Sequence, residues 1–204
     1  MLISFEGIDG CGKSTNIENL RKYLKKKEYD VQVFREPGGT VLSEQIRNIL
    51  LNSEEDIHPI AESLLFSAAR AQLVATRIRP VLEKGGIVIL DRFYDSTTAY
   101  QGYGREIIPV WQIEQLNALA TQNLEPDITF YLRLSPEEAE QRRIRERSED
   151  RLERSGTAFF HRVSKGFDKL ASENDRIITL DSTQPADTLI EEIVSHLQKQ
   201  LDRL

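Results

Sequence analysis

The sequence of 204 residues predicts an α/β fold, a doubly wound parallel sheet of five strands with helices on both faces. Short apolar runs alternate along the chain with longer amphipathic stretches, which is the pattern of strands interleaved with helices. Residues 87–90, Ile-Val-Ile-Leu, are apolar throughout, as is typical of a strand buried on both faces of a parallel sheet.

The individual elements follow from the same patterns. Strands are expected at residues 2–6, 31–35, 87–91, 128–134 and 177–181. Helices are expected at residues 14–27, 41–51, 59–84, 109–122, 136–147, 157–172 and 186–201. The helix at 136 has the clearest start, because Ser135 can cap it, Pro136 fits its first turn and Glu138 stands at its third position. Ligands of such folds bind at the carboxyl ends of the strands, so we expect the functional site there.

The composition argues against several classes of partner. The net charge of −6 disfavours duplex nucleic acid, which needs a basic face. No apolar run approaches the ~20 residues of a membrane span, and the N-terminus lacks the pattern of a signal peptide. A single cysteine, Cys11, excludes an internal disulfide and fits a reducing compartment. We therefore predict a cytoplasmic protein with neither a nucleic acid nor a membrane as its partner.

Residues 7–14, Gly-Ile-Asp-Gly-Cys-Gly-Lys-Ser, match the phosphate-loop pattern G-x-x-x-x-G-K-[ST] between a predicted strand and a predicted helix. Glycines let backbone N–H groups close around phosphate oxygens. Lys13 would reach the β- and γ-phosphates of ATP, and Ser14 would bind Mg²⁺. The candidate ligands of the ATP phosphates are Gly7, Ile8, Asp9, Gly10, Cys11, Gly12, Lys13, Ser14 and Thr15.

Asp91 is the second candidate ligand of Mg²⁺. It ends the all-apolar strand, where the metal-side aspartate of a phosphate-loop enzyme stands. The alternative is an aspartate that only caps the following turn. Cys11 occupies a variable position of the loop and is expected to have no chemical role, although the helix that follows could lower its pKa.

A second phosphate-binding region is expected beside the loop. Arg35 and Arg92 each follow or close a strand, so both reach the carboxyl edge of the sheet, where a guanidinium can hold a phosphate in a two-pronged contact. Phe66 and Arg70 are four residues apart and share one helix face. Taken alone, Phe66 is more often a core residue, and Arg70 could be a solvated helix charge. Trp111 is expected in the core.

Five segments together resemble the thymidylate kinase family, in nearly the whole chain. They are residues 5–10, 35–40 (Arg-Glu-Pro-Gly-Gly-Thr), 64–70, 91–93 (Asp-Arg-Phe) and 96–102 (Ser-Thr-Thr-Ala-Tyr-Gln-Gly). The second and fifth segments are specific to this family. The resemblance implies a homodimeric enzyme that converts ATP and dTMP to ADP and dTDP, with ATP and Mg²⁺ as cofactors. A different small kinase acting on dUMP, UMP or a non-nucleotide stays the nearest alternative, and a nucleotide-dependent switch is another.

The resemblance also implies roles for single residues. Asp9 looks like the carboxylate that meets the 3′-hydroxyl of dTMP and helps to organise the metal. Arg35 and Arg92 look like clamps on the dTMP phosphate. On the base, the candidates are Phe66 as the stacked ring, Arg70 as the donor to O4, and Thr97 and Gln101 at the base edge. Tyr100 resembles the aromatic residue against the sugar, where it would crowd a ribose 2′-hydroxyl.

An arginine-rich segment at about 142–156 is predicted to be a lid within a single kinase domain, residues 1–204. Six arginines stand between Arg142 and Arg154, interleaved with acids, so a salt-bridged exposed helix is the simplest interpretation. The resemblance is to bacterial-type members, which carry glycine at the position of Gly10 and arginines in the lid. We therefore expect Arg147 or Arg151 to act in catalysis with Asp9, Lys13 and Arg92, and Arg142 and Arg143 are lesser candidates.

Overall fold

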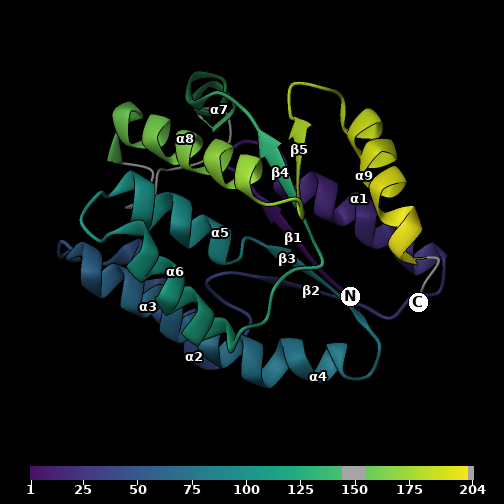
Figure 1. Ribbon diagram of the computed structural model, residues 1–204, viewed down its shortest axis with the longest axis horizontal. Helices are drawn as coiled ribbons and strands as arrows, with labels where there is room; N and C mark the ends of the chain where they lie inside the picture. The colour runs from purple at the N-terminus through teal and green to yellow at the C-terminus, as the bar shows by residue number, and fades with distance from the viewer. Residues whose placement is uncertain (144–154, 202–204) are drawn as a thin grey trace.

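The computed structural model describes residues 1–143 and 155–201 and contains one five-stranded sheet (Figure 1). Its strands are β1 (Leu2–Glu6), β2 (Val31–Arg35), β3 (Ile87–Asp91), β4 (Ile128–Arg133) and β5 (Ile177–Asp181). They are all parallel, in the order β2-β3-β1-β4-β5. The predicted fold class is confirmed.

The helices cover both faces of this sheet. They are α1 (Lys13–Lys26), α2 (Val41–Asn52), α3 (Pro59–Leu73), α4 (Arg79–Leu82), α5 (Tyr94–Thr97), α6 (Val110–Thr121), α7 (Pro136–Arg143), α8 (Thr157–Glu173) and α9 (Ala186–Leu201), with π-helical segments η1 (Val74–Ile78) and η2 (Thr98–Gly104). Alternate strand residues point to opposite faces. Ile3 and Ile89 therefore pack with Leu20 of α1, whereas Leu2 and Val88 pack with Leu73 at the end of α3.

The helix expected at 59–84 is not uniform. It widens into the π-helical segment η1 directly before Pro80, which stands in the first turn of α4. Proline has no N–H to donate, and its ring collides with the carbonyl four residues earlier, so the regular α-helical pattern cannot continue through it. The predicted capping of α7 is present: Ser135 accepts from the amide of Glu138 at 3.3 Å and donates to its carboxylate at 2.7 Å.

Residues 94–104 form α5 and η2, which the sequence patterns do not predict. This stretch is rich in threonine, tyrosine and glycine, which are weak helix formers. Tertiary packing holds it instead. A Cβ on Gly104 would lie 2.7 Å from Phe159, and one on Gly166 would lie 2.8 Å from Tyr103. The two glycines therefore let η2 and α8 approach closely, and this packing places Tyr100 and Gln101.

Candidate active site

The phosphate loop joins β1 to α1 with the backbone geometry that its glycines predict. Gly7 has a φ of 132°, and a Cβ there would lie 2.6 Å from the carbonyl oxygen of Leu132 and 2.8 Å from the Cys11 sulfur. A side chain at this position is therefore excluded by space as well as by conformation. Gly12, at a φ of 88°, turns the chain into the first residue of α1.

Lys13 is buried and lies over the loop. Its Nζ donates to the carbonyl oxygens of Gly7 and Ile8, each at 3.1 Å, and stands 3.8 Å from the carboxylate of Asp9. This places the ammonium group at the concave side of a loop whose glycines leave its backbone open to an anion. Lys13 thus lies against the loop, and its contact with the ATP phosphates stays a prediction.

Cys11 lies inside the loop and is fully buried. Burial raises the pKa of its thiol, although the charges of Lys13 and Arg92 oppose this. The lowering of this pKa that the helix N-terminus could cause is therefore not seen. Its carbonyl oxygen accepts a hydrogen bond from the hydroxyl of Ser182, so Cys11 ties the loop to the segment after β5.

The candidate magnesium ligands lie on two elements that follow neighbouring strands or end them, helix α1 after β1 and strand β3. Ser14 is exposed on the first turn of α1, and Asp91 is half-buried at the end of β3, in register with Phe5 just before the loop. Residues 1–143 and 155–201 contain no group of three or more His, Cys, Asp or Glu able to hold a metal ion by themselves. One hydroxyl and one carboxylate suffice for Mg²⁺, because it keeps several waters and binds substrate phosphates.

Arg92 joins the loop to the rest of the site. Its guanidinium donates to the Gly7 carbonyl at 2.8 Å and to Asp9 at 2.8 Å, and also to Ser96 at 3.0 Å and the Tyr100 hydroxyl at 3.2 Å. Burial by itself lowers the pKa of Arg92. The negative charge of Asp9 and the neighbouring Tyr100 and Asp91 nevertheless hold this pKa well above its ordinary value. Arg92 is therefore a permanent positive charge at the edge of the loop.

Glu6 stabilises the segment that directly follows Arg92. Its buried carboxylate accepts from the backbone amide of Phe93 at 2.7 Å and from the hydroxyl of Ser96. Burial, with the negative charge of Asp95, raises the pKa of Glu6 from 4.5 to about 8, although Ser96 and Arg92 lower it. Glu6 in the folded chain is therefore protonated below about pH 8.

Replacing Glu6 with glutamine is expected to flatten the pH dependence of stability. Between pH 4.5 and about 8 the folded chain keeps a proton on Glu6 that the unfolded chain has released. The stability that Glu6 contributes is therefore complete below pH 4.5, the pKa in the unfolded chain, and is lost as the pH rises through about 8, the pKa in the folded chain. The slope for one such group reaches about 1.4 kcal/mol per pH unit. Urea unfolding across this range, compared in wild type and Glu6→Gln, measures it, and identical slopes would contradict the prediction.

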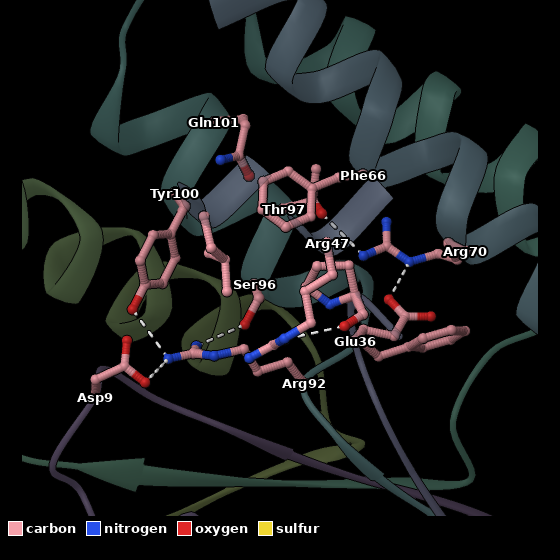
Figure 2. A pocket seen from close by; sticks show the side chains of 13 residues that line it. Asp9, Glu36, Arg47, Phe66, Arg70, Arg92, Ser96, Thr97, Tyr100 and Gln101 are labelled. Carbon is pink, nitrogen blue, oxygen red and sulfur yellow. Dashed lines mark hydrogen bonds and ion pairs between the residues drawn. The ribbon is translucent and has the colours of Figure 1, made fainter. Parts of the chain in front are cut away.

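A pocket that is open to solvent lies beside the loop (Figure 2). We call it the arginine pocket. Its lining residues are Asp9, Glu36, Pro37, Arg47, Leu51, Phe66, Arg70, Arg92, Phe93, Ser96, Thr97, Tyr100 and Gln101. It therefore brings together seven residues predicted for the acceptor: Asp9, Phe66, Arg70, Arg92, Thr97, Tyr100 and Gln101.

Arg70 is not a solvated helix charge, because only 2% of it is exposed. Its guanidinium donates to Glu36 at 2.7 Å, to the Thr97 hydroxyl at 2.9 Å and to Asn117 at 3.0 Å. Burial raises the pKa of Glu36, and the contact with Arg70 partly offsets this. The second oxygen of Glu36 is buried without a hydrogen-bond partner. Three acceptors from three parts of the chain thus hold Arg70 in one orientation at the wall of the pocket.

The aromatic residues of the pocket are held on their outer sides. Phe66 is half-buried and packs against the cluster of Ile46, Leu50 and Ala69. The ring of Tyr100 makes edge contacts with Phe159 and Phe167 of α8, with centroids 6.0 and 6.2 Å away. Both rings therefore have fixed positions, and each also borders the pocket.

Arg35 does not line the pocket. Its side chain is 56% exposed and donates to Glu44 at 3.0 Å. Arg47 of α2 lines the pocket instead and donates to the carbonyl of Pro37 at 3.0 Å. Arg47 is not among the residues predicted for the site, although it stands four residues after the buried Ser43 and so borders the inward face of its helix.

The two lid arginines chosen from the sequence, Arg147 and Arg151, lie outside the described residues. Arg142, at the near end of this segment, donates to the carbonyl of Ser182 at 3.0 Å. At its far end, Ser155 accepts from Arg105 at 3.2 Å. The described ends of the segment therefore reach both the loop side and the pocket side of the site.

A parallel sheet with a phosphate loop, facing a pocket that holds three arginines, defines a phosphate-loop phosphotransferase with separate donor and acceptor sites. The sequence model of the thymidylate kinase family matches residues 5–193, and this chain belongs to that family. Its members are kinases that use ATP to convert dTMP to dTDP, so the predicted family, enzyme class, cofactor ATP and acceptor dTMP are confirmed.

Several relatives cover nearly the whole chain. A thymidylate kinase of Chlorobium chlorochromatii is 48% identical, over 98% of this chain and 96% of its own. One of Thermoanaerobacter pseudethanolicus is 44% identical over 98% of both chains. The crystal structure of thymidylate kinase from Ehrlichia chaffeensis superposes with a TM-score of 0.78 at 36% identity, over 97% of this chain and 98% of that one. Among residues 1–143 and 155–201, no helix is long and apolar enough to cross a membrane.

Proposed function

We propose that this chain holds dTMP in the arginine pocket and the phosphates of ATP in the phosphate loop, and transfers the γ-phosphoryl group between them. Arg92 is the observation that carries this proposal. One guanidinium contacts Gly7 and Asp9 of the loop and Ser96 and Tyr100 of the pocket. A charge shared by the two sites is where the transferring group needs stabilisation.

The acceptor phosphate is assigned to Arg92 and Arg47, because both line the pocket. Their forks suit the oxygens of a phosphate. Arg35 stays a predicted clamp only, since its guanidinium is engaged by Glu44. On the base side, Phe66 offers a ring for stacking, and Arg70, Thr97 and Gln101 line the pocket beside it (Figure 2). Asp9, which accepts a hydrogen bond from Arg92, is assigned to the sugar hydroxyl and the metal.

Catalysis in this arrangement consists of positioning and charge, with no covalent intermediate. Lys13 stabilises negative charge on the donor phosphates, and Arg92 stabilises it on the side of the acceptor. Ser14 and Asp91 would hold Mg²⁺, which supplies charge neutralisation at the phosphates. Arg147 and Arg151 stay predictions for the charge that the lid contributes. We assign these roles within one kinase domain, residues 1–204, with its lid at about 142–156.

A substrate panel tests the proposal. ADP release is measured with dTMP, dUMP, UMP, dCMP and AMP as acceptors. We expect dTMP to react fastest and UMP to react at least ~10-fold more slowly than dUMP, because Tyr100 is packed against α8 and in the proposed placement would crowd a 2′-hydroxyl. Comparable rates with UMP and dUMP would contradict the role of Tyr100. Saturation by ATP without transfer to any pyrimidine monophosphate would contradict the function itself.

The predicted homodimer is supported by one apolar surface. Helices α2 with α3, and α3 with α6, pack side by side (Figure 1). Their outer faces expose large apolar side chains: Val41, Leu42, Ile49, Ile60, Leu64, Trp111 and Leu119. Trp111, expected in the core, is 56% exposed. We propose that a second copy of this chain covers this surface. Light scattering tests this, because a dimer has twice the mass of the 23.4 kDa chain and a monomer would contradict the proposal. The cytoplasmic location stays a prediction.

A further inference from the structure

Glu62 of α3 is a fully buried carboxylate directly behind the arginine pocket, and no role is yet assigned to it. It accepts a hydrogen bond from Nε2 of Gln101 at 2.9 Å. It also accepts from Nε and from a terminal nitrogen of Arg105, each at 3.2 Å, in an ion pair. Gln101 is 2% exposed and lines the pocket. Glu62 is therefore connected to the site through Gln101.

These contacts determine which way the Gln101 amide faces. A carboxylate paired with an arginine can only accept hydrogen bonds. The N–H of the amide must face Glu62, because the reversed amide would set its oxygen against a carboxylate oxygen in a site with little water. Gln101 therefore presents its amide oxygen, an acceptor, to the pocket. Figure 2 shows this amide above the space between Tyr100 and Phe66.

The opposite partner of this acceptor is Arg70. It can only donate, and Glu36, Thr97 and Asn117 fix its orientation. The pocket thus offers a donor from Arg70 and an acceptor from Gln101. Thymine and uracil carry the complement, an acceptor at O4 beside a donor at N3–H. Cytosine carries the reverse, an amino donor beside an acceptor nitrogen.

We propose that Glu62, through the amide orientation it imposes on Gln101, is a positioning residue that makes the pocket reject cytosine nucleotides. The inference rests on the proposed placement of the base in the arginine pocket. Glu62 itself touches no substrate, and Arg105 keeps its carboxylate an obligate acceptor. A free amide could turn over and offer N–H to the cytosine ring nitrogen. Arg70 disfavours the cytosine amino group in either case, so it is the part of the selectivity set at the ring nitrogen that depends on Glu62.

The test is the variant Glu62→Gln, with kcat and KM measured for dTMP and for dCMP at saturating ATP. Glutamine keeps the size of the side chain but can donate or accept, so the Gln101 amide is no longer held in one orientation. We expect the ratio of kcat/KM for dTMP over dCMP to fall at least ~10-fold, since a site that matches a hydrogen-bonding edge discriminates strongly. The KM for dTMP should rise while kcat changes less than ~3-fold, because the amide is remote from the reacting phosphate.

Two comparisons separate positioning from a merely structural role. Asp95→Asn also breaks a buried ion pair, the one with Arg176 at 2.7 Å, and should lower the melting temperature but leave the dTMP/dCMP ratio unchanged. In a Gln101→Leu background, Glu62→Gln should have no further effect on that ratio.

A folded Glu62→Gln protein with the wild-type ratio would overturn the inference. If it does not fold, Gln101→Leu alone is used, and an unchanged ratio there would overturn the inference equally, because Glu62 acts only through that amide. Wild-type activity on dTMP tests the proposed function separately.

Discussion

Replacing Lys13 with methionine is expected to lower kcat on the order of 10³-fold, the effect of removing one pre-positioned charge from a transferring phosphoryl group. Methionine has about the length of the lysine stem but no charge. The Lys13 ammonium is buried against the Gly7 and Ile8 carbonyls, in a site where a charge acts with little screening. The ADP-release assay with dTMP measures the change.

Lys22→Met is the matched control for this variant. Lys22 lies on the same helix, is 68% exposed and forms a 3.6 Å ion pair with Glu18. Such a surface ion pair contributes little to stability, and neither of its side chains belongs to the phosphate loop. We expect activity within about 2-fold of wild type for this control, as surface charges far from a site have small effects. A Lys13→Met enzyme that kept kcat within the same range would refute the assignment of the donor site.

Replacing Arg92 with alanine is expected to lower kcat/KM for dTMP by about 10³-fold or more, the second large effect. Three losses combine. The acceptor phosphate loses a fork, the transferring group loses a charge, and Asp9 loses its 2.8 Å partner. Because Arg92 also holds the Gly7 carbonyl, the KM for ATP should rise as well, which distinguishes it from a residue of the acceptor site alone.

The conservative variant Arg92→Lys shows which property matters. An ammonium retains the charge but cannot contact the loop and the pocket at once, so we expect it to recover only a small part of the lost activity. Arg21→Ala, which removes a half-exposed ion pair with Glu18 on α1, serves as the control and should behave as wild type. Near-normal kcat/KM in a folded Arg92→Ala enzyme would mean that the two sites do not share this charge.

Local patterns in the sequence predicted much of the site. The strands, the phosphate loop and the strand-end position of Arg92 each depend on residues within a few positions of one another, and all lie where expected. Phe66 and Arg70 were paired by helical spacing, and both line the pocket. Short-range signals of this kind survive folding because backbone conformation and side-chain direction set them.

The helical stretch at 94–104 could not be predicted in this way. Its residues are poor helix formers, and it is stabilised by close packing on α8, which lies more than fifty residues further along the chain. The placement of Tyr100 and Gln101 therefore depends on two contacts between distant parts of the chain. In these contacts Gly104 faces the ring of Phe159, and Gly166 faces the ring of Tyr103. Trp111 shows the reverse case, an apolar residue whose helical spacing suggested the core but whose face of α6 points outward.

The sequence by itself determined the doubly wound sheet, the donor loop and the family, because apolar patterning, an eight-residue motif and short characteristic segments are each legible without a distant partner. Only the tertiary structure decided that Arg47 rather than Arg35 borders the pocket, and that the buried carboxylate of Glu36 lies at its wall and that of Glu62 behind it. Glu36 meets Arg70 across 34 positions of sequence, and Glu62 meets Gln101 across 39. Local sequence does not reveal such partners. A buried carboxylate or guanidinium is costly unless it is paired, and the partner comes from whichever part of the chain the fold brings beside it.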